Sequence, residues 1–149
     1  MLNRIADLIT SMTSNPDRAA SYEFKDTAVA AAVLMIEAAR QDGDPHPNEF
    51  RAMAERLTQR YNLTPDERES LIALAVEKNE NLTHLFQLTG LLKDQKTRDE
   101  RKALMEDLWA VAYADGELHK YEADIIERIG KMLGMTGMDI QGAKQRAAG

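Results

Sequence analysis

A pattern of eight residues, D-G-acid-x-H-x-x-E, occurs twice in this chain of 149 residues. Residues 42–49 read DGDPHPNE, and residues 115–122, which begin 73 positions later, read DGELHKYE. Each copy follows an alanine-rich amphipathic segment and precedes a second segment with helical spacing of its apolar residues. We therefore expect two related helical hairpins that carry acidic side chains at their bends.

The composition supports a helical protein. Ala, Leu, Ile, Met, Glu, Arg and Lys, the residues that lose least on entering a helix, are abundant, whereas aromatic residues make up only 5% of the chain. A chain of this length is typical of one domain and can bury a substantial core. The sequence therefore predicts a single all-α domain.

The spacing of apolar residues predicts the order of the helices. The clearest helix start is Thr64-Pro65-Asp66-Glu67, which combines an N-cap, a proline at the first helical position and a capping-box glutamate. Thr97 and Glu100 repeat the capping-box pattern, and Gly134 is placed to end a helix. The predicted helices cover about 2–12, 26–41, 47–61, 65–78, 81–92, 97–114 and 120–133, with a short last helix that frays from Lys144.

These elements define the expected organisation of the single domain, residues 1–149. A leading helix and connector occupy residues 1–24, the first repeat residues 25–80, a linking helix residues 81–96, and the second repeat residues 97–149. The expected architecture is a pseudo-twofold bundle of seven or eight helices, built from two helix–acidic bend–helix repeats.

Several classes of function are disfavoured by the charge and composition. A net charge of −6 argues against a nucleic-acid partner, and the absence of cysteine excludes disulfides, thiolate metal sites and thiol redox chemistry. Arg4 and Asp7 interrupt the apolar N-terminal stretch, so it does not read as a signal peptide. The longest apolar run, residues 27–36, is too short to cross a membrane. We expect a cytoplasmic protein without a membrane partner.

The acidic side chains of the two bends are the candidate functional site. Clusters of carboxylate oxygens suit hard divalent cations, with calcium the first expectation and magnesium or manganese next. His46 and His119 occupy matching positions and, as ligands, would shift the preference toward zinc or manganese. No organic cofactor is expected. The predicted ligands are Asp42, Asp44, Glu49, Asp115, Glu117 and Glu122.

A purely structural interpretation of the bends competes with the cation site. Gly43 and Gly116 explain the turns by tolerating a positive φ, and the ring of each matching histidine would accept a local backbone hydrogen bond. Glu49 and Glu122 would be ordinary capping-box residues. A metal-dependent hydrolase is a third reading, but no serine or cysteine nucleophile accompanies the histidine in either phrase.

The repeated unit resembles the TerB-like domain of tellurite-resistance proteins. The residues Ala114-Asp115-Gly116-Glu117 followed by Glu122 match the A-D-G-E…E signature of that family, and residues 41–44 with Glu49 form a looser first copy. The resemblance extends over about residues 28–139. The family usually has Ser or Thr at the helix cap of the bend, where this chain has histidine.

The resemblance implies an all-α, non-enzymatic cytoplasmic protein of metal or stress response, which acts through protein partners. It also implies that the acids of the bends form a cation site. Direct binding of tellurite is disfavoured because this oxyanion is repelled by carboxylates, and its reduction would require thiols or a redox cofactor. A metal-independent interaction scaffold is the alternative function.

Overall fold

The alanine-rich helix Asp26–Ala39 (α2) lies at the centre of the protein. The computed structural model describes residues 24–40, 46–80 and 85–148. All but two of the residues of α2 are buried, because the helix packs against α3, α4, α5, α6 and α7. The sequence predicted a single apolar stripe on this helix, whereas the structure buries it on all sides. Small alanine side chains permit this close packing on every face.

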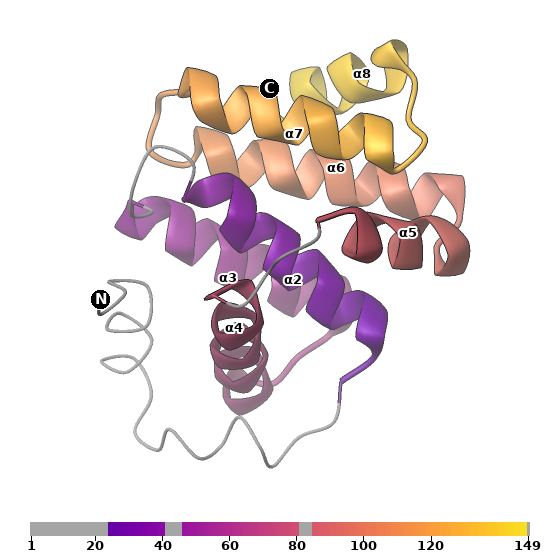
Figure 1. Cartoon of the computed structure of the whole chain (residues 1–149). Helices are drawn as coiled ribbons and strands as arrows, with labels where there is room; N and C mark the ends of the chain where they lie inside the picture. Colours follow the sequence, from indigo (N-terminus) through magenta and orange to yellow (C-terminus); the bar gives the residue numbers. More distant parts are fainter. Residues whose placement is uncertain (1–23, 41–45, 81–84, 149) are drawn as a thin grey trace.

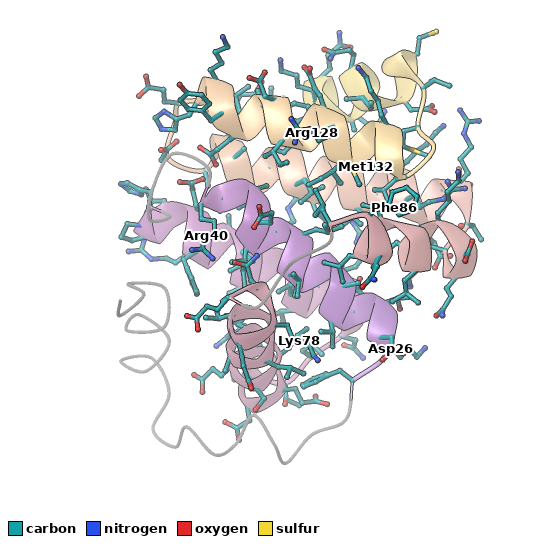
Figure 2. All side chains as sticks on the ribbon, in the orientation of Figure 1. Asp26, Arg40, Lys78, Phe86, Arg128 and Met132 are labelled. Atoms are coloured by element: carbon teal, nitrogen blue, oxygen red, sulfur yellow. The ribbon has the colours of Figure 1, made fainter. Side chains whose placement is uncertain are left out.

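Helix α3 (Pro47–Tyr61) follows the first bend, and α4 (Pro65–Glu80) packs against both α2 and α3. Figure 1 shows α4 crossing α2 steeply, whereas α6 and α7 lie side by side in the other half of the molecule. Asp26 and Arg40 mark the two ends of α2 in Figure 2. The first bend therefore leaves α2 at the end opposite to Asp26.

The second half consists of α5 (Leu85–Gln95), α6 (Arg98–Tyr113), α7 (Lys120–Met132) and α8 (Gly137–Ala148). Helix α8 packs along α6, where the fully buried Trp109 donates a hydrogen bond of 3.2 Å from Nε1 to the carbonyl of Ile140. Lys144 lies over the same indole ring, with Nζ 5.2 Å from its centroid. These contacts fix the last helix to the core.

The prediction of an all-helical protein is confirmed. The described residues form seven helices and no strand. Within them no helix is both long and apolar enough to cross a bilayer. The predicted leading helix of residues 2–12 and the predicted cap at Asn81 lie outside the described residues.

The predicted helix boundaries hold where a local signal marks them. Reciprocal capping bonds join Thr64 to Glu67 and Thr97 to Glu100. Gly134 ends α7 with a φ of 78°, as expected for a glycine beyond a helix terminus. Where no such signal exists, the observed boundaries differ from the predicted ones. Helix α5 continues beyond the predicted end at Leu92 to Gln95. The expected fraying from Lys144 is wrong, because α8 stays helical through Ala148.

Candidate functional site

The start of α3 and the turn between α6 and α7 carry the described acids of the two bends. In the view of Figure 1 both lie at the same end of the molecule. Asp42 and Asp44 of the first bend lie outside the described residues. Glu49 and Glu122 occupy the same place in the two repeats, the third position of the helix after the bend.

Glu49 is a buried carboxylate held at the helix start. The side chain is only 2% exposed, and its Oε1 accepts a hydrogen bond of 3.1 Å from the backbone N–H of His46. Its Oε2 is also buried and has no hydrogen-bond partner among the described residues. The Nδ1 of His46 accepts a bond of 3.0 Å from the backbone N–H of Asn48. The expected capping role of both side chains is confirmed.

The second bend has a different arrangement. Oδ1 of Asp115 accepts a hydrogen bond of 3.1 Å from the backbone N–H of Glu117, and Oδ2 lies 3.3 Å from Nε2 of His119. Gly116 has a φ of 86°, which confirms the predicted glycine turn. Glu117 is exposed, whereas Glu122 is fully buried at the start of α7. The structure thus brings Asp115 and His119 together and leaves Glu117 facing solvent.

The described residues do not form a complete cation site as they stand. Across residues 24–40, 46–80 and 85–148, no three His, Asp or Glu side chains lie close enough together to hold a metal ion. The exposed Glu117 would have to turn toward Asp115 to share an ion with it. An exposed side chain makes such a change of rotamer at small cost.

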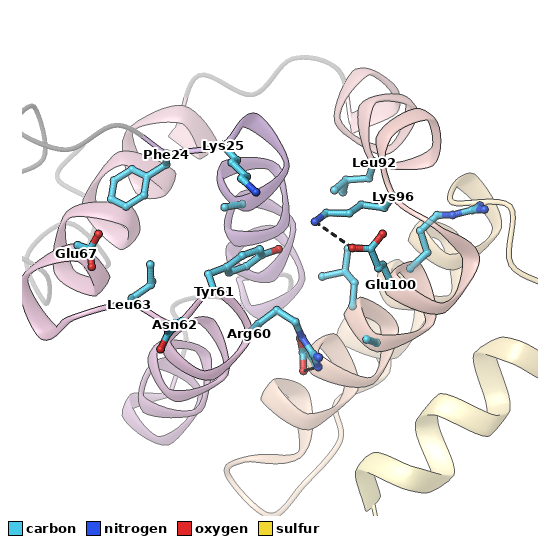
Figure 3. A pocket seen from close by; sticks show the side chains of 15 residues that line it. Phe24, Lys25, Arg60, Tyr61, Asn62, Leu63, Glu67, Leu92, Lys96 and Glu100 are labelled. Carbon is cyan, nitrogen blue, oxygen red and sulfur yellow. Dashed lines mark hydrogen bonds and ion pairs between the residues drawn. The ribbon is translucent and has the colours of Figure 1, made fainter.

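A cleft of about 610 Å³ lies away from the two acidic phrases, and the sequence did not predict it. It is bordered by the start of α2, the end of α3, the end of α5, the first turn of α4 and the N-terminal half of α6 as far as Asp107. Figure 3 shows Tyr61 between Phe24 and Leu63 on one side and Leu92 and Lys96 on the other. Nζ of Lys96 lies 5.8 Å from the centroid of the tyrosine ring.

The electrostatics of this cleft centre on the buried Asp107. Its carboxylate accepts hydrogen bonds from Arg60 and Arg56 of α3, and the bonds that Arg60 donates to Asp107 raise the pKa of Arg60. Burial, together with the negative charge of Asp107, raises the pKa of Tyr61 to about 12. The phenol therefore stays neutral and able to donate a hydrogen bond at any physiological pH.

The fold and the repeated bends agree with the comparison with protein families. The family model of tellurite resistance protein TerB matches residues 28–145, so the chain belongs to the TerB family. No curated protein sequence matches the chain significantly. The predicted family resemblance is therefore confirmed over most of the chain.

A solved structure shares this fold. The crystal structure of PG1108, a protein of unknown function from Porphyromonas gingivalis W83, superposes with a TM-score of 0.58. The match covers 86% of this chain and 92% of the other, at 16% sequence identity. At this identity the likeness concerns the fold alone.

Proposed function

We propose that this protein is a non-enzymatic TerB-family module that binds a divalent cation, calcium first, at its acidic bends. In this proposal it acts in the cytoplasm through protein partners, in a response to metal or tellurite stress. Bound cations relieve the repulsion between carboxylates and stiffen the bends, and this changes the surface that a partner meets. The ligands come from the six acids of the two phrases.

The burial of Glu49 carries this proposal. A carboxylate removed from water loses a large hydration free energy unless charge or hydrogen bonds replace it. One oxygen of Glu49 has the backbone N–H of His46, but Oε2 has no hydrogen-bond partner in the described part of the chain. A divalent cation in the first bend would supply a positive charge beside this oxygen and so replace the hydration that the oxygen has lost.

The second bend also places a buried carboxylate at the start of a helix. Glu122 is completely buried at the position equivalent to Glu49, and Asp115 precedes it with its side chain only 11% exposed. Carboxylates that are largely withdrawn from water are stabilised by a nearby positive charge. A cation bound by Asp115, Glu117 and Glu122 would supply that charge.

Calorimetric titration of calcium into EDTA-treated protein tests the proposal. The double variant Asp42→Asn/Asp115→Asn should lose binding while its helical circular dichroism stays unchanged. Asp94→Asn/Asp99→Asn is the matched control, because it removes the same charge from two exposed positions outside the bends. Equal calcium binding by the bend variant and the control would refute the site, and unfolding of the bend variant would assign the acids a structural role.

A metal-independent interaction scaffold is the second candidate function. It is favoured by the hydrogen bonds of Asp115 and Glu49 to backbone N–H groups, which are typical of well-made turns and helix caps. In this case a partner would bind equally well in the presence of EDTA and of calcium.

A further inference from the structure

The cleft around Tyr61 has the dimensions of a ligand site. Its volume of about 610 Å³ lies within the range of roughly 300–1,000 Å³ that is common for small-molecule pockets. Leu92 and Leu104, both buried, contribute apolar surface beside the tyrosine ring. This surface can receive an apolar group of a ligand.

The acidic side chains that line the cleft are all engaged in bonds within the protein. Glu67 and Glu100 accept hydrogen bonds of 2.9 Å from the backbone N–H groups of Thr64 and Thr97 in their capping boxes. Asp107 is neutralised by its arginines. None of these carboxylates is therefore placed to attract a cationic ligand.

Two lysines of the lining retain binding capacity. The side chain of Lys25 makes no hydrogen bond or ion pair within the described residues and is exposed at the start of α2. Nζ of Lys96 lies 3.6 Å from Oε2 of Glu100, whose side chain is half exposed. An ion pair of this length with a half-exposed carboxylate contributes little free energy, so a ligand can replace Glu100 at small cost.

The helix ends contribute little net potential to the cleft. The N-termini of α2, α4 and α6 border it and carry partial positive charge, but the first turn of each of these helices holds at least one acidic side chain. Four basic side chains line it against three acidic ones. This excess of a single positive charge suits a monoanion better than a phosphate dianion.

We propose that this cleft binds a small amphipathic monoanion, a carboxylate attached to an apolar body. The carboxylate lies between Lys25 and Lys96, and the apolar body packs against Tyr61, Leu92 and Leu104. The neutral phenol of Tyr61 can donate a further hydrogen bond to the carboxylate. This site is separate from the cation site of the bends, so that either can be present without the other.

Calorimetric titration with decanoate tests the proposed site in the full-length protein. Decanoate should bind saturably at one site per chain, whereas acetate, which lacks the apolar body, and decanol, which lacks the charge, should bind at least tenfold more weakly. No saturable binding of decanoate would overturn the proposal. Equal binding of decanol would show that the cleft does not select an anion.

Matched variants locate the binding. Lys96→Gln should weaken decanoate binding about tenfold through the loss of one charge-assisted contact, whereas Lys93→Gln, in the last turn of α5 and outside the cleft, should not. Ala103→Phe should abolish binding by filling the cleft, and Ala110→Phe, on α6 outside the cleft, is its control. Circular dichroism verifies that each variant is folded. Equal effects of cleft variants and controls would place the decanoate elsewhere and refute the site.

Discussion

The guanidinium of Arg60 donates two hydrogen bonds of 3.0 Å, one to each oxygen of Asp107, whose side chain is only 1% exposed. Arg56 adds a third bond of 3.3 Å to the same carboxylate. These contacts connect α3, which follows the first bend, to α6, which precedes the second. A charge as deeply buried as Asp107 is tolerated because both of its oxygens are paired.

Asp107→Asn should therefore lower the free energy of unfolding by about 2 kcal/mol, because it removes hydrogen bonds between charged groups and brings an amide N–H₂ toward the guanidinium groups. Denaturant unfolding measures this loss. Glu106→Gln is the control, since its partner Arg146 is half exposed and the pair contributes less than about 1 kcal/mol. Equal losses in the two variants would contradict a special role for the buried carboxylate.

Gly130 allows α7 and α8 to approach closely. A Cβ at this position would lie 2.7 Å from Cγ1 of Ile140 and 3.0 Å from Cε of Met105, both in the core. Gly130→Ala should therefore destabilise the protein by about 1 kcal/mol, as overpacking outweighs the gain in helix propensity. Gly90→Ala in α5 meets no atom within 4 Å and should be neutral or stabilising. Thermal unfolding compares the two variants, and greater stability of Gly130→Ala would show that the helices can separate without cost.

Asp139 couples the stability of α8 to pH. A hydrogen bond of 2.7 Å from Arg98, together with the bonds to Thr136, holds the pKa of this carboxyl well below its ordinary value of 3.8. Because the folded-state pKa is lowered, the stabilisation is present in full above about pH 4 and is lost as the pH falls further.

Asp139→Asn should consequently be less stable than the wild type at pH 6, and the difference should shrink progressively below pH 4. Chemical unfolding at a series of pH values measures it, with the exposed Asp94→Asn as control. A difference between Asp139→Asn and the wild type that does not vary with pH would mean that the carboxylate contributes no pH-linked stability.

The sequence predicts those parts of the fold that local signals specify. Thr64, Thr97 and Gly134 mark helix ends through bonds to neighbouring residues, so their positions can be read from a few adjacent letters. The end of α5 has no such mark: its apolar pattern stops at Leu92, yet the helix continues, and Lys96 at its end packs over Tyr61. Tertiary packing decides that boundary.

The two sites differ in the same way. Glu49 and Glu122 could be selected because a repeated phrase singles them out, but their burial could not be predicted from that phrase, because Glu100 at the same position of its helix is half exposed. The cleft brings together Lys25, Tyr61 and Lys96, which no motif connects and which lie at the ends of three helices. Only the packing of these helices, with Asp107 paired between them, shows that the residues are neighbours.

The central claim is that the bends bind a divalent cation, and thermal unfolding of EDTA-treated protein tests it most directly. Added calcium should raise the melting temperature saturably, because a ligand that binds only the folded state at 100 times its Kd stabilises it by about 2.7 kcal/mol. Magnesium, manganese and zinc in parallel titrations establish the preference among ions. A melting temperature unchanged by all four ions would contradict the claim and leave the acidic bends as structural turns.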